Sequence, residues 1–359
     1  MKKMIKVLIV DDSAFMRKLI TDILSNEENI EVIGTARNGE DCLTKLKTLK
    51  PDVITMDVEM PVMNGLDALK EVMALYKLPV IMLSSTTKEG ASNTILAMQY
   101  GAVDFITKPS GAISLDLHKV KDEIVTKVLQ SSKANITNLV KPLQTQKMSY
   151  NRRVFNSKNE LDARSKVLQK PLVCIGTSTG GPRALQHVLT RLPNQFPAPI
   201  LIVQHMPAGF TKSLAKRLDS ICHIEVKEAE NGELLKNGVA YIAPGGYHLK
   251  LKEIGTSVAI QIDESEIRNG HRPSVDVMFE SVSHLSSFRK IAVIMTGMGS
   301  DGAKGLVELK KSGNTTAITE SEQTSVVYGM PKVAAETNLV DEVADVDKIA
   351  DVILKYIGM

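Results

Sequence analysis

A glycine-rich segment with one central serine, IGTSTGGPRAL at residues 175–185, is the first candidate for chemistry. Gly176, Ser178 and Gly180 fit the GxSxG spacing, in which small neighbours let the chain turn sharply from a strand into a helix and expose the serine hydroxyl. The glycine that lets pyrophosphate approach in GxGxxG is absent, and no Walker lysine follows. The segment favours a nucleophilic serine over a phosphate-binding loop, although an ordinary turn serine also fits so short a string.

A nucleophilic serine needs a base to take its proton and a carboxylate to orient that base. Of the seven histidines, His205 is the one placed at the end of an apolar run, ILIV at 200–203 followed by Gln204. Asp301 follows IAVIM at 291–295 through the glycine-rich segment TGMGSDGAKG. Each residue alone could be a strand-end or capping residue. Because the carboxyl ends of parallel strands meet at one sheet edge, their agreement predicts a triad of Ser178, His205 and Asp301.

A second group of polar residues follows apolar runs in the first third of the chain: Asp11 and Asp12, Asp57, Ser84, and Lys108. Three carboxylates at one sheet edge repel one another unless a cation neutralises them, and hard oxygen ligands favour Mg²⁺. A lysine and a hydroxyl opposite them would complement the oxygens of a phosphoryl group. Loop aspartates would explain each residue singly. Because suitable polar residues follow all four predicted strands, the sequence favours a phosphoryl site with Mg²⁺.

The elements that position the second group can be predicted from alternating apolar and amphipathic segments. Short apolar runs at 7–10, 53–56, 80–83 and 105–106 are typical of buried parallel strands. The amphipathic stretches between them predict helices on both faces of one sheet. The fold class predicted for this part is a doubly wound α/β domain.

A second doubly wound, mainly parallel α/β domain is predicted from Pro171 onward. PLVCI, APILIV, IAVIM and TTAI are again apolar strand runs, whereas GVAYIAPGGYHLKL and SVAIQIDES suggest antiparallel hairpin strands. In the predicted helix LQHVLTRL, His187 lies about 200° around the axis from Leu185. His187 is therefore expected to face solvent.

Length and charge support two domains joined by a linker. A chain of 359 residues is longer than one core usually supports. Residues 132–170 contain nine Lys or Arg and two Asp or Glu, a net charge of +7 in a chain whose total is +3. This segment, which is also rich in Ser, Asn and Gln, predicts a flexible basic linker. A basic excess outside the folded domains argues against nucleic-acid binding.

The compartment follows from cysteine content and hydropathy. Cys42, Cys174 and Cys222 are too few and too scattered for a disulfide framework or a zinc site, which predicts a reducing compartment, most simply the cytoplasm. No apolar stretch approaches the roughly 18 residues of a membrane span. The amino-terminal apolar run stops at Asp11, short of the ~7–15 residues of a signal-peptide core. No membrane insertion is expected.

The first domain resembles the receiver domain of two-component response regulators, here flavodoxin-like in fold. The resemblance rests on LIVDDSAFMR, ITMDVEMPVMNGLDAL, PVIMLSS and DFITKP. It implies phosphoryl transfer from a histidine kinase to an aspartate, with Mg²⁺ as the receiver's cofactor. The implied roles are phosphoryl acceptor for Asp57, Mg²⁺ ligands for Asp12 and Asp57 with Asp11 acting through water, a backbone carbonyl ligand for Glu59, phosphoryl contact for Lys108, and hydroxyl and aromatic switch positions for Ser84 and Phe105.

The second domain resembles the catalytic domain of the chemotaxis protein-glutamate methylesterases. IGTSTGGPRAL, VQHMPAGFT, YIAPGGYHL, HRPSVDVMF, MTGMGSDGAKG and SEQTSVVYGMPKVA carry this resemblance. It implies hydrolysis of glutamate γ-methyl esters on chemoreceptors, with glutamine deamidation as a plausible second activity. Backbone amides of Thr179 and Met298 would stabilise the oxyanion, and no cofactor would be needed in this domain. The expected boundaries are 1–124 for the receiver domain, 125–169 for the linker and 170–359 for the esterase domain.

Three interpretations of the output domain remain open at this point. The triad alone fits a serine peptidase or an esterase of another specificity, because the surrounding loops set the substrate. A DNA-binding output domain is disfavoured by the charge distribution. For the methylesterase, we hypothesise that the unphosphorylated receiver covers the triad edge and that phosphorylation of Asp57 shifts the population toward an open arrangement.

Overall fold

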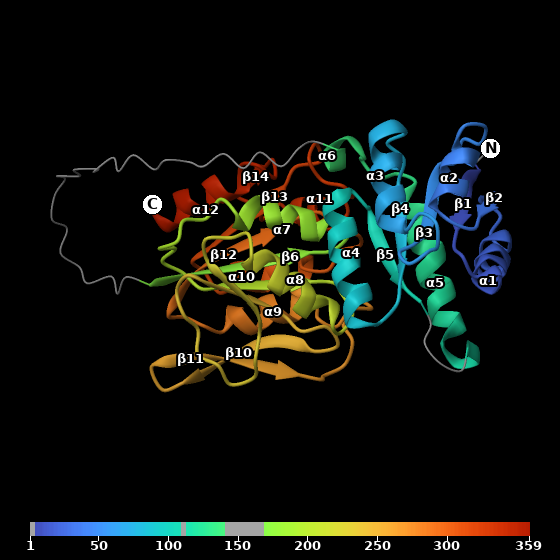
Figure 1. The fold of residues 1–359 in the computed structure, drawn as a ribbon. Helices are drawn as coiled ribbons and strands as arrows, with labels where there is room; N and C mark the ends of the chain where they lie inside the picture. Colours follow the sequence, from blue (N-terminus) through green and yellow to red (C-terminus); the bar gives the residue numbers. More distant parts are fainter. Residues whose placement is uncertain (1–3, 109–112, 141–168) are drawn as a thin grey trace, which may run out of the picture.

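Two α/β domains lie side by side in the computed structural model, with the amino terminus at the far end of the first and the carboxyl terminus at the far end of the second (Figure 1). The structure describes residues 4–108, 113–140 and 169–359. Most of the predicted linker, residues 141–168, lies outside the described residues. Helix α5 (Ile113–Ser131) continues past residue 124, and a short helix α6 (Thr137–Val140) follows it.

The first domain is a five-stranded parallel sheet in the order β2-β1-β3-β4-β5, which is the flavodoxin-like order. Four of these strands contain the predicted apolar runs, and their residues are almost entirely buried because helices cover both faces. The strands are β1 (Ile5–Val10), β2 (Ile30–Ala36), β3 (Val53–Asp57), β4 (Val80–Ser84) and β5 (Asp104–Thr107), and the helices before α5 are α1 (Ala14–Ser25), α2 (Gly39–Leu46), α3 (Gly65–Leu75) and α4 (Lys88–Tyr100).

The second domain is built on a seven-stranded parallel sheet in the order β14-β13-β12-β6-β7-β9-β8. β6, β7 and β12 are neighbours at its centre, so the loops that follow them share one edge. The order reverses between β6 and β12, the place where open α/β sheets bind ligands. The strands are β6 (Lys170–Thr177), β7 (Ile200–Gln204), β8 (Glu225–Glu228), β9 (Val239–Ile242), β12 (Phe288–Ile294), β13 (Thr315–Glu320) and β14 (Glu342–Ala344).

The hairpin prediction is half wrong. β10 (His248–Ile254) and β11 (Ser257–Asp263) do pair antiparallel, as a separate two-stranded sheet. VAYI, however, forms β9 of the main sheet and pairs parallel with both β7 and β8. Its four residues are all buried, which suits a central parallel strand better than a half-exposed hairpin.

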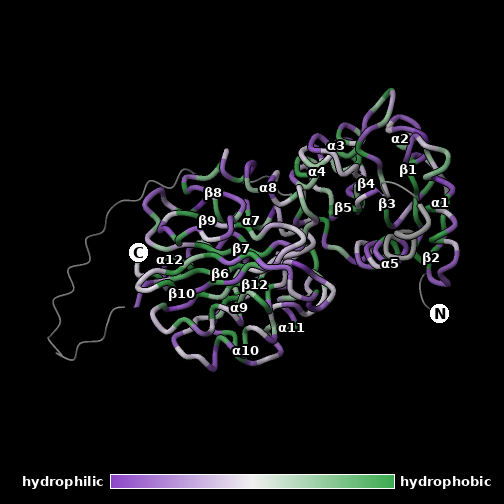
Figure 2. Tube along the Cα trace, turned by 90° about the horizontal axis from the view of Figure 1, so that it is seen from below, coloured by the Kyte–Doolittle hydropathy of each residue, from purple (hydrophilic) through white to green (hydrophobic). Residues whose placement is uncertain are grey.

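Helices on both faces of the second sheet complete its core. Hydrophobic residues concentrate along the central strands, and hydrophilic ones lie mainly at the periphery (Figure 2). None of the helices in the described residues is long and apolar enough to cross a bilayer. The helices are α7 (Gly181–Leu189), α8 (Phe210–Asp219), α9 (Val275–Ser283), α10 (Ala303–Lys311), α11 (Met330–Glu336) and α12 (Ile349–Ile357).

Candidate active site and phosphorylation site

Ser178 lies where β6 ends and α7 begins, on the turn that its glycines predict. Gly180 has a φ of 77°, in the left-handed region that favours glycine, and Pro182 lies in the first turn of the helix. The Ser178 N–H donates to the carbonyl of Thr296 at 3.0 Å, which ties this turn to the loop after β12. Gly297 is needed there, because a Cβ on it would lie 2.7 Å from the Ser178 Cβ.

His205 and Asp301 meet at the same edge. The His205 N–H continues the β6–β7 pairing by donating to the Thr177 carbonyl at 3.1 Å. Nε2 of the His205 ring lies 2.8 Å from Oδ2 of Asp301, and both side chains are almost fully buried. Nδ1 is buried without a hydrogen-bond partner, so it is the ring nitrogen left to accept a proton. Within the described residues, no hydrogen bond joins the Ser178 hydroxyl to this ring.

The environment of Asp301 keeps its carboxylate charged. Burial alone would favour the neutral acid, but hydrogen bonds from His205, from the Val275 N–H and from the Ser274 hydroxyl together hold the pKa of Asp301 well below its usual range. A carboxylate that stays ionised can stabilise an imidazolium on His205 during proton transfer.

Ser178 and His205 open into one cavity of about 660 Å³. Thr179 and Met298, the two oxyanion candidates, also line it. Within the described part of the chain, the backbone N–H groups of these two residues make no hydrogen bond. They are therefore available as donors to an oxyanion.

The first domain forms one wall of this cavity through β5 and α5. The Thr179 hydroxyl donates to Oδ2 of Asp104 at 2.5 Å, so a carboxylate of the first domain contacts the residue that follows Ser178. Lys127 neutralises that carboxylate at 3.2 Å. Next to it, the Phe105 ring stacks on Phe210 of α8 with 4.6 Å between centroids. Phe105, the predicted aromatic switch position, thus contacts the second domain directly. Sequence analysis did not predict the contacts of Asp104 and Lys127.

A second histidine covers the His205 ring. His271 stacks on His205 with 3.7 Å between centroids and an interplanar angle of 11°. Burial, together with the neighbouring His205, lowers the pKa of His271 to about 4, so it is neutral at physiological pH. His271 begins the segment HRPSVD at residues 271–276, and the unusual composition of this segment is the feature of the sequence that could have indicated a role for His271.

The candidate phosphorylation site lies at the corresponding edge of the first sheet. Lys108 Nζ is 2.8 Å from Oδ2 of Asp57 and 2.9 Å from Oδ2 of Asp11. Burial raises the pKa of Asp57 to about 6, and the charge of Asp11 adds to this, whereas Lys108 opposes it. Side-chain oxygens of Asp11, Asp12 and Asp57 lie within 4.8 Å of one another. Such a set of hard oxygen donors fits Mg²⁺.

The remaining receiver residues have different surroundings. Ser84 is fully buried, accepts from the Thr94 hydroxyl at 2.6 Å and donates to the Gly90 carbonyl at 3.2 Å. The Glu59 side chain is exposed, and its N–H donates to Oδ1 of Asp57 at 3.4 Å. Its role as a carbonyl ligand therefore stays a prediction.

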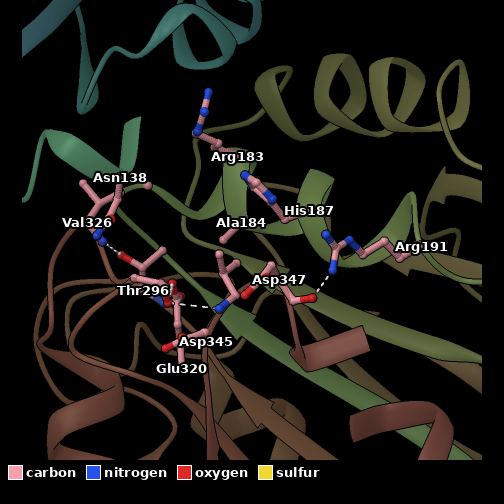
Figure 3. Close-up of a pocket in the computed structure, with 13 residues that line it drawn as sticks. Asn138, Arg183, Ala184, His187, Arg191, Thr296, Glu320, Val326, Asp345 and Asp347 are labelled. Carbon is pink, nitrogen blue, oxygen red and sulfur yellow. Dashed lines mark hydrogen bonds between the residues drawn. The ribbon is translucent and has the colours of Figure 1, made fainter. Parts of the chain in front are cut away.

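His187 does not face solvent as predicted. It is half-buried in a separate cavity of about 380 Å³ between α7, α6 and the loops that follow β13 and β14 (Figure 3). Burial and the flanking Arg183 and Arg191 lower the pKa of His187 to about 4. The helical angle was correct, but other segments cover that face of the helix. Glu320 at the floor of this cavity accepts from the Thr296 N–H at 2.8 Å, behind the loops of the candidate active site.

Comparisons with known proteins agree with this architecture. The CheB methylesterase family model matches residues 173–353, and the response regulator receiver domain model matches residues 7–118. The protein-glutamate methylesterase/protein-glutamine glutaminase of Halalkalibacterium halodurans is 59% identical, covering 99% of both chains. Its counterpart in Bacillus subtilis is 50% identical over 97% of both. The crystal structure of the Thermotoga maritima CheB methylesterase catalytic domain is 47% identical with a TM-score of 0.51, covering 52% of this chain and 98% of that one. The chain belongs to the CheB methylesterase family and carries a response regulator receiver domain in front of its methylesterase domain.

Proposed function

We propose that this protein hydrolyses glutamate γ-methyl esters on chemoreceptors, and deamidates glutamines there, through Ser178, His205 and Asp301. The observation that carries the proposal is the 2.8 Å contact between His205 Nε2 and Asp301 in the cavity that Ser178 lines. The names of the relatives, protein-glutamate methylesterase/protein-glutamine glutaminase, supply the substrate class.

The reaction follows the usual logic of a serine hydrolase. The Ser178 hydroxyl attacks the ester carbonyl while Nδ1 of His205 takes its proton, and the N–H groups of Thr179 and Met298 receive the charge that develops on the carbonyl oxygen. His205 then protonates the departing methanol. A water molecule, deprotonated by the same ring, releases the glutamate carboxylate. With a glutamine amide, ammonia departs in place of methanol.

The receiver domain would control this reaction as a phosphorylated switch. Asp57 accepts the phosphoryl group from a chemotaxis histidine kinase, and Lys108 contacts its oxygens. Asp11, Asp12 and Asp57 would hold Mg²⁺, with the Glu59 carbonyl as a further ligand, and the bound ion would neutralise the phosphoryl oxygens. Ser84 and Phe105 would carry the change to the domain interface.

Autoinhibition is supported by the wall that the receiver contributes to the cavity. Asp104 and Lys127 lie beside Thr179, so a receptor helix could reach Ser178 only after the two domains separate. Phosphorylation of Asp57 would favour the separated arrangement because it would stabilise that arrangement more than the closed one. We propose residues 1–124 as receiver, 125–169 as linker and 170–359 as esterase, acting in the cytoplasm where the receptor helices and the kinase are found.

A product assay tests this function against other hydrolase specificities. Methylated receptor cytoplasmic domain is incubated with the full-length protein, with and without a phosphoryl donor and Mg²⁺, and methanol, ammonia and receptor length are measured. We expect methanol release, stimulated by phosphorylation, from a receptor chain that stays intact. Cleavage of the receptor backbone without methanol would indicate a peptidase and contradict the proposal.

A further inference from the structure

The Asp301 carboxylate is held at the amino terminus of α9. Oδ2 accepts from the Val275 N–H at 2.6 Å, and Oδ1 accepts from the Asp276 N–H at 3.2 Å and from the Ser274 hydroxyl at 2.8 Å. The first amides of a helix carry partial positive charge and lack intrahelical acceptors. Asp301, which comes from the loop after β12, therefore accepts from the first amides of a helix to which it does not belong.

Asp276 makes the reciprocal contact. This residue lies in the first turn of α9, is fully buried, and uses Oδ1 to accept from the N–H groups of Gly302 at 2.9 Å and Gly305 at 2.7 Å. Gly302 is the N-cap of α10 and has no side chain with which to cap it. Asp276 of α9 therefore accepts from the first amides of α10, and Asp301, in the loop that leads into α10, accepts from the first amides of α9 in addition to the side-chain cap that Ser274 provides there.

Asn269 joins the two carboxylates. Its Nδ2 donates to Oδ2 of Asp276 at 2.8 Å and to Oδ1 of Asp301 at 2.9 Å. Burial and the nearby charge of Asp301 raise the pKa of Asp276, as expected for two carboxylates in close proximity. An amide donor between them relieves that repulsion. Asn269 has a φ of 53°, a conformation that asparagine tolerates better than most residues.

We propose that Asp276 and Asn269 are positioning residues that fix the Asp301 carboxylate against His205. The inference rests on the proposed function, because it assigns both residues to the hydrolytic triad. Among the described residues, neither Asp276 nor Asn269 is hydrogen-bonded to the His205 ring, and their effect passes through Asp301. A purely structural pair would instead hold α9 and α10 together without affecting proton transfer.

Asp276→Asn separates these two possibilities. The new amide can still accept from Gly302 and Gly305, but its NH₂ group would face the NH₂ group of Asn269. Asn269 must then turn its amide, which places a carbonyl oxygen against the Asp301 carboxylate. We expect kcat to fall about 10- to 100-fold with little change in KM, because a displacement on the order of 1 Å at a catalytic group costs about 100-fold.

A double-mutant cycle in the full-length, phosphorylated protein tests the coupling. Two readouts are used: methanol release, and the rate at which a fluorophosphonate labels Ser178. We expect Asp276→Asn to slow both about 10- to 100-fold in the wild-type background. In the Asp301→Ala background it should slow them less than about 2-fold, since coupled residues are not additive. Equal losses in both backgrounds would overturn the positioning role.

Three further variants guard against a misfolded protein. Asp219→Asn alters a carboxylate that accepts the Val226 N–H elsewhere in the same domain, and should leave both rates unchanged. Asn269→Gly removes the bridging amide but tolerates the left-handed backbone, whereas Asn269→Asp puts a third carboxylate there. We expect Asn269→Asp to slow labelling more than Asn269→Gly, and Asn269→Gly to keep a single cooperative thermal unfolding transition. Wild-type labelling rates in both Asn269 variants would also overturn the inference.

The two readouts keep this inference separate from the proposed function. If the wild-type protein is labelled by the fluorophosphonate but releases no methanol from methylated receptor, the proposed substrate is wrong. The labelling cycle would still report on the positioning of Asp301. If methanol is released and the cycle shows no coupling, the inference is wrong and the function stands.

Discussion

Gln99 is the residue through which the proposed autoinhibition can be tested without touching the active site. It lies near the end of α4, which packs against α7 and α8 (Figure 1). Its side chain donates to Oε1 of Gln186 at 3.1 Å and accepts from Nε of Arg217 at 3.1 Å. Both partners belong to the catalytic domain, so Gln99→Ala removes two hydrogen bonds that exist only in the closed arrangement.

The expected magnitude follows from those two bonds. One joins neutral groups and the other involves a charged guanidinium, so their loss destabilises the closed arrangement by about 2 kcal/mol. The closed-to-open ratio then falls about 30-fold, because about 1.4 kcal/mol corresponds to a factor of ten. While the closed state predominates, methanol release by the unphosphorylated protein should rise by nearly the same factor. Release by the phosphorylated protein should change less than about 2-fold.

A matched variant on the same helix controls for general damage to α4. Ser92 is exposed, and within the described residues its hydroxyl bonds only to the Lys88 carbonyl of the same helix, so Ser92→Ala should leave both rates unchanged. The account is refuted if Gln99→Ala does not raise unphosphorylated activity. An equal increase with and without phosphorylation would also refute it, because it would indicate a change in the active site and not in the domain equilibrium.

Three other outcomes are expected. Burial raises the pKa of Glu320 to about 7 from its ordinary value of 4.5, so this group stabilises the fold below pH 4.5 and that stability is lost as pH rises through 7. The unfolding free energy of the wild type relative to Glu320→Gln should therefore fall by about 3 kcal/mol across this range in chemical denaturation, and a flat difference would contradict the assignment. Gly297→Ala, which forces a Cβ against Ser178, should lower kcat at least about 100-fold while circular dichroism stays native. Removing Mg²⁺ with EDTA should abolish the stimulation of methanol release by a phosphoryl donor but leave the basal rate unchanged. Asp57→Asn should have the same two effects. Stimulation that survives either change would place the phosphoryl site elsewhere.

Sequence patterns predicted those features of the fold that depend on short-range periodicity. The apolar runs located the central strands. Asp11, Asp57 and Lys108 each follow one of these runs, and the structure places them together at one edge of the sheet, as predicted. The same reasoning predicted that His205 and Asp301 lie close together, because parallel strands place their carboxyl ends at one edge, and the structure shows this contact.

Contacts that depend on tertiary packing could not be predicted. The helical angle of His187 says nothing about the segments that cover that face, and the composition of VAYI does not distinguish a hairpin strand from a parallel one. Asp104 accepts a hydrogen bond from Thr179 only because the two domains pack against each other. Asn269 and Asp276 are ordinary polar residues in the sequence, and their hydrogen bonds become apparent only when α9 and α10 are placed together.

The nucleophile is tested most directly by mass spectrometry of the phosphorylated protein, quenched during turnover of methylated receptor, with Ser178→Ala as the comparison. The account predicts a transient acyl adduct on the peptide that contains Ser178, and a rate of methanol release at least about 1,000-fold lower in the variant. Methanol release by Ser178→Ala at a rate near that of the wild type would contradict it.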